Sequence, residues 1–281
     1  MALHIVTDST CDLPQSLLTE LRVTVLPCNL HIGEKTLLDG IDITSAEFYQ
    51  RLLQGNVSPK TSQPSVGAFL DVYNKIGRPG EEILSLHISA KLSGTYNSAF
   101  QAAKEAQTKA KIEVVDSMTV SLGLGFLVRE VGNLAKQGGT LKQATDFLGR
   151  EIPNVTCYCS VDTLDYLVRG GRASRVQGFL GSLLDVKPII SVRDGEVHPV
   201  ERVRTRKRML ARMVELGGEA KNLLGLGVMH SACPEEAEEL ADKLGQFFPR
   251  NNIMVREFTP VMGAHLGPKA VGLAMWKGAP R

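Results

Sequence analysis

The chain has 281 residues, of which 43% are hydrophobic and 22% are charged, and its formal net charge is only +2. This length fits one large or two ordinary domains, and a charge so near zero gives no reason to expect nucleic acid or an anionic membrane as a partner. The sequence has no apolar run of about 18 residues and no signal-peptide pattern at its start, so we expect a cytoplasmic protein without a membrane span.

The first half alternates short apolar runs with segments of helical periodicity. Thr44 and Glu47 form a capping box, Ser65 is a good helix N-cap, and residues 57–65 form a polar, Pro-rich loop. The pattern predicts strands at 3–8, 23–27, 82–89 and 112–117, and a hairpin at 29–40 around Gly33. Helices are predicted at 14–21, 44–54 and 65–76, from the residue after Tyr96 to about Lys109, from the last strand to Gly138, and from Thr140.

Such alternation of strands and helices predicts a Rossmann-like parallel sheet with helices on both faces. Ligands of these sheets bind beyond the carboxyl ends of the strands. Three polar loops are expected there, namely TDSTCD after the first strand, SAKLSGT after Ile88 and DSMT after Val115.

The second half has a different pattern. Asp194-Gly195 favours a type I′ turn within a hairpin at 189–200. Strands are also predicted at 155–161, 223–230, 252–258 and 271–276, with helices around 165–174, from Thr205, and at 234–246. We therefore expect an α/β protein of two domains, an N-terminal α/β domain at 1–155 and a C-terminal α+β domain at 156–281.

The chain has five cysteines, an odd number without the spacing of a disulfide framework. Cys157 and Cys159 alternate along a predicted strand, so both point to one face of the sheet. Buried packing explains them well, whereas a metal pair would need His or Cys partners that no other segment supplies at the right spacing. We expect reduced thiols and no metal.

The signatures of several common enzyme classes are missing from the sequence. It contains no P-loop, no HExxH zinc-protease pattern and no GxSxG nucleophile elbow. The nearest approach to a dinucleotide fingerprint, Gly123-x-Gly125, lacks the third glycine and lies in a helical stretch. An enzyme of one of these common classes would usually show such a signature, although convergent active sites need not.

Two loops rich in hydroxyl groups precede predicted helices. In the first, Lys60 to Ser65, Thr61 is able to donate to an anion at a helix N-terminus, although simple capping by Ser65 is the plainer explanation. In the second, Ser89 to Thr95, Ser93 either caps the following helix or offers its hydroxyl to a ligand, and Gly94 allows close backbone approach.

Basic groups form three further candidate sites. Arg169 and Arg172 flank a diglycine, where a guanidinium suits a carboxylate or phosphate but also suits the C-terminus of a helix. His265 lies among small residues, where it is a candidate donor to an oxyanion or a structural histidine. The basic segment 202–208 includes Arg202 and Arg204. It has three possible roles, namely a nucleic-acid-binding site, a solvated helix face and a docking patch for a protein.

Taken in order, these segments resemble the DegV family of bacterial fatty-acid-binding proteins across nearly the whole chain, about residues 3–280. The matching motifs are DSTCDLP (8–14), TSQPS (61–65), ISAKLSGTYNSA (88–99), VVDS (114–117), DYLVRGGRAS (165–174), VRTRKRM (203–209) and HLGPKAVG (265–272). The one departure is at Ser89-Ala90, where a second serine is common in the family.

The resemblance implies a binding protein without a cofactor rather than an enzyme. Its two α/β domains would have a tunnel between them that holds a long-chain fatty acid such as palmitate or oleate. Residues matching Thr61 and Ser93 would hold its carboxylate near the backbone of Gly94, supported by Arg169 or Arg172 and by His265. Some family members carry acids to a separate fatty acid kinase in lipid metabolism, and Arg202 and Arg204 would then be candidates for contact with that kinase.

Two alternatives stay open from the sequence. Convergence of Ser, Arg and His residues on one edge of the sheet would also suit an acyl or phosphoryl transferase with its own activity, and segment 202–208 would suit a nucleic-acid binder. The tunnel lining is not encoded in any visible pattern. Helix 176–184, with Phe179, Leu180, Leu183 and Leu184, is one candidate, although core packing explains these residues equally well.

Overall fold

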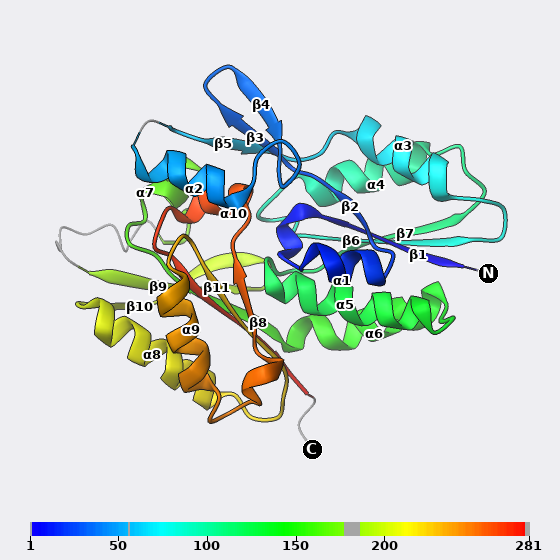
Figure 1. Cartoon of the computed structure of the whole chain (residues 1–281). Helices are drawn as coiled ribbons and strands as arrows, with labels where there is room; N and C mark the ends of the chain where they lie inside the picture. The colour runs from blue at the N-terminus through cyan, green and yellow to red at the C-terminus, as the bar shows by residue number, and fades with distance from the viewer. Residues whose placement is uncertain (1, 56, 177–185, 279–281) are drawn as a thin grey trace.

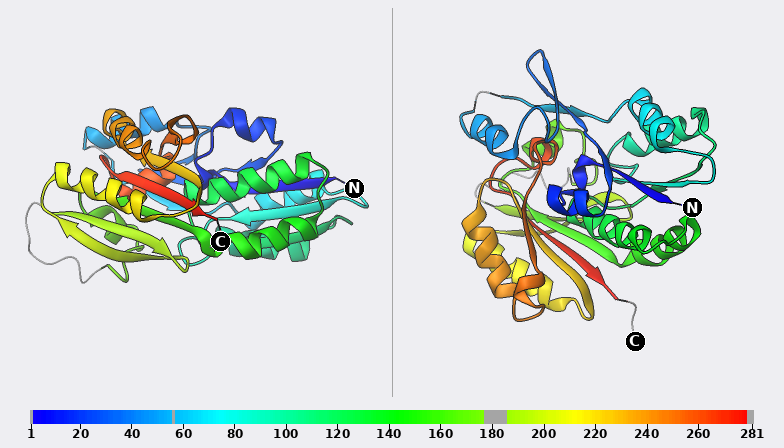
Figure 2. Two further views of the ribbon diagram at one scale, coloured as in Figure 1. Left: turned by 90° about the horizontal axis from the view of Figure 1, so that it is seen from below. Right: turned by 45° about the vertical axis from the view of Figure 1, so that its right-hand side comes forward.

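The computed structural model describes residues 2–55, 57–176 and 186–278 of the chain, and its main feature is two β-sheets lying side by side (Figures 1 and 2). The first sheet has four parallel strands in the order β2-β1-β6-β7. Its strands are β1 (Leu3–Asp8), β2 (Thr24–Leu26), β6 (Glu82–His87) and β7 (Lys111–Asp116). The parallel sheet expected from the sequence is thus confirmed.

Helices cover both faces of this sheet, because neighbouring side chains along each strand point to opposite faces. In β1, Val6 packs in the cluster that includes Phe69 and Tyr73 of α3, whereas Ile5 packs in the cluster that includes α5. The helices are α1 (Gln15–Glu20), α3 (Val66–Ile76), α4 (Thr95–Glu105), α5 (Leu122–Lys136) and α6 (Leu141–Glu151). Helices α3 and α4 lie on one side, and α5 and α6 on the other (Figure 1).

The second sheet is mixed and has six strands in the order β10-β9-β8-β13-β11-β12. Asp194 and Gly195 both have positive φ (49° and 77°) in the β9–β10 turn, as the hairpin prediction requires. The strands are β8 (Val155–Ser160), β9 (Lys187–Arg193), β10 (Glu196–Val203), β11 (Leu223–His230), β12 (Met254–Glu257) and β13 (Val271–Lys277). Helices α8 (Arg206–Glu219) and α9 (Pro234–Leu244) cover one face, and α7 (Asp165–Arg169) follows β8.

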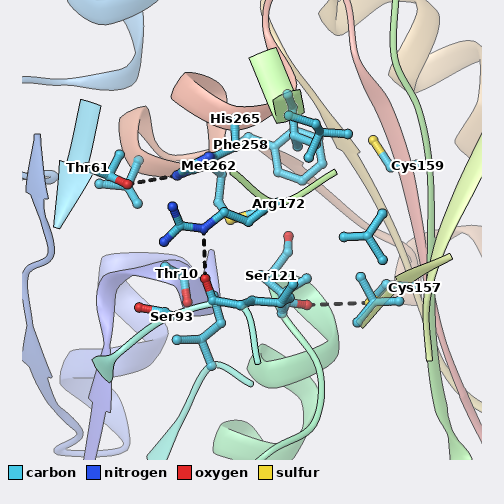
Figure 3. Close-up of a pocket in the computed structure, with 18 of the residues that line it drawn as sticks. Thr10, Thr61, Ser93, Ser121, Cys157, Cys159, Arg172, Phe258, Met262 and His265 are labelled. Carbon is cyan, nitrogen blue, oxygen red and sulfur yellow. Dashed lines mark hydrogen bonds between the residues drawn. The ribbon is translucent and has the colours of Figure 1, made fainter. Parts of the chain in front are cut away.

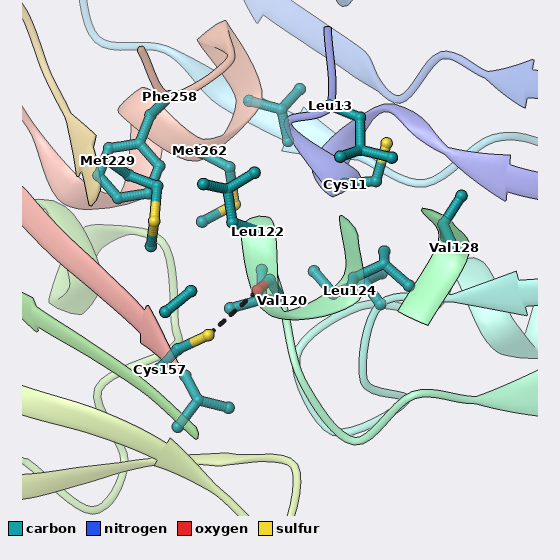
Figure 4. Packing of buried hydrophobic residues seen from close by; sticks show 14 of the residues in the cluster. Cys11, Leu13, Val120, Leu122, Leu124, Val128, Cys157, Met229, Phe258 and Met262 are labelled. Atoms are coloured by element: carbon teal, nitrogen blue, oxygen red, sulfur yellow. Dashed lines mark hydrogen bonds between the residues drawn. The ribbon is translucent and has the colours of Figure 1, made fainter. Parts of the chain in front are cut away.

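Helix α5 packs against both large sheets and joins their cores (Figure 4). Its glycines allow this close approach, since a Cβ on Gly123 would lie 2.6 Å from the Cys157 sulfur and one on Gly125 would lie 2.6 Å from the Cys11 carbonyl oxygen. The Gly123-x-Gly125 pair is therefore explained by packing of α5 against β8 and the loop after β1. No helix in the described part of the chain is long and apolar enough to cross a membrane.

A third, small sheet connects the two halves of the chain. It has the order β4-β3-β5, with β3 (Asn29–Ile32), β4 (Lys35–Leu38) and β5 (Lys60–Ser62). The strand β5 lies within the segment that we predicted to be a loop, and that prediction was wrong for these three residues. Thr61 pairs with Leu30 of β3, a partner 31 positions away, so local composition gives no sign of the strand.

Helix α10 (Pro260–Leu266) packs against β3, β5, α7 and the capped helix α2 (Ser45–Leu53), and the sequence did not predict it. Its run of small residues lacks a helical apolar pattern, and Gly263 is needed because a Cβ there would lie 2.5 Å from the Tyr49 hydroxyl oxygen. Helix α4 ends at Glu105 rather than near Lys109, where Gln107 N–H donates instead to the Asn74 side chain. The candidate tunnel helix 176–184 lies outside the described residues, apart from its first residue.

Candidate functional site

A mainly apolar cavity lies between the parallel sheet, the six-stranded sheet and helix α10, and we call it the inner cavity (Figure 3). Its empty space, counted together with adjoining open solvent, is about 880 Å³. Two of the three loops expected beyond the strand ends contribute to its wall, through Thr10 and Ser93. The third, residues 116–119, does not line it, although Val120 and Ser121 directly after that loop do. Several polar side chains gather in the wall near β5 and α10, and we call this part of the cavity its polar end. They belong to Thr61, Ser62, Gln63, Ser93, Arg172 and His265.

Thr61 and His265 meet at this polar end although 204 positions separate them in the chain. Thr61 Oγ1 and His265 Nε2 share a hydrogen bond of 2.7 Å, which joins strand β5 to the last turn of helix α10. Burial, and then the positive charge of Arg172, lower the pKa of His265 to about 4. The imidazole is therefore neutral at physiological pH, when one ring nitrogen donates and the other accepts.

Gly170 makes room for the other side of the His265 ring. A Cβ at position 170 would lie 2.2 Å from His265 Nδ1, so no larger residue fits there without moving the ring. Nδ1 is buried and has no hydrogen-bond partner among the described residues. The diglycine that follows α7 thus positions the histidine, in addition to closing the helix.

Arg172 brings a partly buried positive charge to the polar end of the cavity. Its Nε donates to the Leu92 carbonyl oxygen at 2.9 Å, and Nη1 donates to the carbonyl oxygen of Gly170. Burial lowers the pKa of the guanidinium, because the charged form is desolvated. No Asp or Glu of residues 2–55, 57–176 or 186–278 forms an ion pair with it, so its charge is available to an anion that enters the cavity.

Ser93 and Gly94 lie at the start of helix α4, facing the TSQPS segment. Ser93 Oγ lies 2.8 Å from Thr95 Oγ1 and accepts from Thr95 N–H at 3.3 Å, while Gly94 occupies the N-cap position. A Cβ on Gly94 would lie 2.8 Å from the side-chain nitrogen of Gln63, so a larger residue there would displace the end of that side chain. The two hydroxyl-rich segments therefore touch, with Thr61 and Ser93 both in the cavity wall.

Beyond this polar end the cavity wall is mainly apolar. Cys157 and Cys159 line it from alternating positions on β8, and both thiols are free, as expected; Cys157 is buried and Cys159 is half-buried. The other apolar side chains in the wall are Cys28, Ile88, Leu92, Val120, Leu167, Ile190, Val192, Val197, Met229, Phe258, Val261, Met262 and Leu266. Sequence analysis missed this set, because its members come from nine separate segments and share no motif.

Arg169 does not line the inner cavity. It belongs to a second, polar opening, the outer cleft, which is lined by Ser58, Pro59, Lys60, Thr61, Tyr166, Arg169, Gly170, Arg172, Ala264 and His265. Its guanidinium stands over the Tyr166 ring, 4.6 Å from the ring centroid, and its Nε donates to the Asp165 carbonyl oxygen. Of the two arginines proposed from the sequence, only Arg172 thus faces both spaces.

The basic segment 202–208 is divided between two elements and is partly neutralised. Arg202 lies on β10, Arg204 is exposed in the turn before α8, and Arg206 forms ion pairs with Glu236 and Asp162. It is therefore not one continuous basic helix face. Among the described residues, no group of three or more His, Cys, Asp or Glu side chains is arranged to hold a metal ion.

A buried chain of Asp8, His87 and Ser85 has the connectivity of a nucleophile triad but lies outside the cavity. His87 Nδ1 is 3.0 Å from the Asp8 carboxylate, and His87 Nε2 is 2.6 Å from Ser85 Oγ. Burial alone would raise the pKa of Asp8, but the hydrogen bond and charge of His87 leave it lowered. Ser85 is inaccessible to solvent and accepts the Tyr73 hydroxyl at 2.7 Å, so this chain holds α3 on the sheet.

Comparison with known proteins gives one consistent family. The DegV family model matches residues 2–278. A DegV domain-containing protein of Staphylococcus aureus (strain COL) is 34% identical over 97% of this chain and 98% of its own. A DegV family protein from Thermus thermophilus, described as binding fatty acid, is 32% identical, with a TM-score of 0.89 over 99% of this chain and 100% of its own. A stearic acid-binding protein from Eubacterium ventriosum is 27% identical, with a TM-score of 0.88 over 98% of each chain.

Proposed function

The chain belongs to the DegV family, and on that premise we propose that it binds a long-chain fatty acid in the inner cavity, with the carboxylate held by Thr61, Ser93 and Arg172. The observation that carries this proposal is the partly buried cation of Arg172 at the polar end of an apolar cavity, without an acidic partner among the residues described. The carboxylate of a fatty acid would supply the negative charge that balances Arg172, and its acyl chain would fill the apolar part of the inner cavity.

The neutral His265 supports this arrangement through Thr61. In the tautomer with the proton on Nε2, His265 donates to Thr61 Oγ1, which leaves the Thr61 hydroxyl hydrogen to donate to the carboxylate. Ser93 supplies a second hydroxyl, and Gly94 keeps its loop against Gln63. Such charge-assisted bonds contribute about 1.5–3 kcal/mol each, and they offset the high cost of burying a carboxylate.

The acyl chain provides the larger part of the affinity. Each buried CH₂ contributes about 0.8 kcal/mol, so a chain of palmitate or oleate length outweighs the head group in binding free energy. The thioethers of Met229 and Met262 and the thiols of Cys157 and Cys159 in the wall are soft and adaptable. The head group therefore sets the orientation of the ligand, and the wall sets its affinity.

We further propose that the protein is a carrier that presents the bound acid to a separate fatty acid kinase, with Arg202 and Arg204 in the docking surface. In this scheme residues 1–155 and 156–281 are two domains that enclose the ligand between them. Arg202→Ala is expected to retain the lipid but to support slower phosphorylation by that kinase. Loss of lipid from Arg202→Ala would instead assign the segment to the binding site.

An acyl or phosphoryl transferase with its own activity is the alternative, and turnover by the purified protein alone would favour it. The carrier proposal is tested by denaturing protein purified from cells and analysing the released lipid by mass spectrometry. We expect a fatty acid of about 14–18 carbons, since such chains bury enough CH₂ groups for tight retention. Protein that is empty and also fails to take up oleate or palmitate would refute the proposal.

A further inference from the structure

Asp12, in the loop after β1, connects three parts of the chain that meet beside the inner cavity. Its carboxylate accepts hydrogen bonds from the Ser121 hydroxyl at the start of α5 and from Thr259 N–H at the start of α10, the latter at 3.1 Å. Its carbonyl oxygen accepts from Arg256 Nε of β12, also at 3.1 Å. Ser121 lies 109 positions from Asp12 and Thr259 lies 247 positions away. We call this set of contacts the Asp12 joint.

The joint holds Ser121 in an unfavourable backbone conformation. Its φ and ψ are 56° and −142°, a combination that residues other than glycine rarely adopt and that persists only where the surroundings enforce it. Ser121 is only 1% exposed. It occupies the N-cap position of α5, yet its side chain makes no capping bond to the helix and donates to Asp12 instead. The hydroxyl therefore belongs to the joint and not to the helix.

The joint separates the inner cavity from a third opening, which we call the side cleft. Ser121 lines the inner cavity (Figure 3), whereas Asp12, Arg256 and Thr259 line the side cleft. Helix α10 begins at the joint and carries several side chains of the cavity wall, including His265 in its last turn. Separation of the joint would therefore free the start of α10 and open the cavity wall toward the side cleft.

The carboxyl group of Asp12 is only 3% exposed. Burial raises its pKa to about 7, although the hydrogen bonds from Ser121 and Thr259 oppose this shift and the charge of Asp39 adds to it. The ionisable side chains around it come from its own loop, the loop after β4, α2, β8 and β12. They are Cys11, Asp39, Tyr49, Cys157, Arg256 and Glu257.

We propose that Asp12 is a positioning residue of the ligand site, whose carboxyl group holds α10 against α5 beside the bound acid, and that the ligand exchanges when the Asp12 joint separates. The inference rests on the proposed function in that the ligand is a fatty acid, whereas the joint is defined by contacts within the chain. Separation admits water to Asp12 and returns its pKa to the ordinary value of 3.8. Charging Asp12 therefore favours separation, and exchange should accelerate as the pH rises through 7.

The test measures the release of cis-parinarate, a fluorescent long-chain acid, into excess oleate by stopped-flow fluorescence at about pH 6 and about pH 8. Asp12→Asn keeps a carbonyl acceptor for Thr259 N–H but has no charge at either pH, whereas Asp12→Ala removes both side-chain contacts. Asp116→Asn is the control. Asp116 is a half-buried carboxyl group at the end of β7 that accepts from Met118 N–H and lines neither the inner cavity nor the side cleft.

Wild-type release should be about tenfold faster at the higher pH, because one proton is lost on separation and the joined state holds that proton up to about pH 7. Asp12→Asn should lose most of this pH dependence and release more slowly than wild type at about pH 8. Asp12→Ala should release faster than wild type even at about pH 6, and the control should follow wild type. Equal pH dependence in wild type and Asp12→Asn would overturn the proposal.

Amide hydrogen exchange of α10 at about pH 8 tests the joint without any ligand. Protection of α10 should be greater in Asp12→Asn than in wild type, and lower in Asp12→Ala. If Asp12→Ala does not fold, the comparison of Asp12→Asn with wild type decides. Equal protection in Asp12→Asn and wild type would overturn the joint. A wild type that binds neither cis-parinarate nor oleate would refute the proposed function, and the expected differences in protection would still support the joint.

Discussion

Replacing Arg172 by methionine removes a positive charge that lines both the inner cavity and the outer cleft, while keeping much of the side-chain volume. In the wild type, Nε and Nη1 are held by the carbonyl oxygens of Leu92 and Gly170, which orient the guanidinium. Its remaining N–H groups can reach a carboxylate. The variant should bind oleate more weakly, and the imidazole of His265 should titrate at higher pH, because Arg172 is one of the two causes of its low pKa.

The size of the loss follows from the exposure of the group. A charge-assisted hydrogen bond contributes about 1.5–3 kcal/mol, and Arg172 is only half buried, so solvent screening favours the lower figure. One lost bond then weakens binding about tenfold, and a lost bidentate pair about a hundredfold. The acyl chain still binds, so we expect reduced affinity rather than none.

Oleate affinity is measured by calorimetry, and the pKa of His265 is followed by NMR of labelled imidazole. Arg175→Met is the matched control, since Arg175 lies three residues away, forms an ion pair with Glu196 and does not line the inner cavity. Circular dichroism checks that each variant is folded. Wild-type affinity in Arg172→Met, with the His265 pKa unchanged, would refute the role given to this charge.

Three further predictions concern other parts of the site. Thr61→Ala and Ser93→Ala should each weaken fatty acid retention about tenfold while leaving the fold intact, and the double variant should lose more. Gly170→Ala should displace the His265 ring, lowering both the oleate affinity and the melting temperature. Burial raises the pKa of Asp12 from 3.8 to about 7, so its contribution to stability is complete below about pH 4 and is lost as the pH rises through 7. Asp12→Asn should therefore lose less stability than wild type over that range in denaturant titrations.

Each of these predictions has a result that contradicts it. Wild-type fatty acid content in the Thr61/Ser93 double variant would remove both hydroxyls from the site. Gly149→Ala is the control for Gly170→Ala, because Gly149 is a helical position with open space around it, where alanine should be neutral or stabilising. Equal losses of oleate affinity and melting temperature in the two variants would contradict the role of the His265 contact. Identical pH dependence for Asp12→Asn and wild type would show that another group titrates.

Local patterns in the sequence were sufficient for most of the fold. Apolar runs identified the strands of the parallel sheet, and the Thr44–Glu47 and Ser65 caps located the starts of α2 and α3, because these features depend on neighbouring residues. Strand β5 and helix α10 were missed. The first depends on pairing with β3, and the second on packing against several distant elements.

The same distinction applies to the candidate site. Thr61, Ser93, Arg172 and His265 were chosen from short motifs and a family resemblance, and the structure brings all four to one end of one cavity. The sequence around Arg169 did not reveal that this residue faces the outer cleft. Its position depends on the ring of Tyr166 and on the packing of that ring against α10. Nor could periodicity reveal the apolar wall, which gathers single side chains from many elements.

The most direct test of the central claim compares the affinity of the protein for oleate with its affinity for methyl oleate, which has the same chain but no charge. Two charge-assisted bonds lost together correspond to about 3 kcal/mol or more, so oleate should bind at least about a hundredfold more tightly. The preference should shrink in Arg172→Met. Equal affinity for the acid and its ester would contradict a site built to hold a carboxylate.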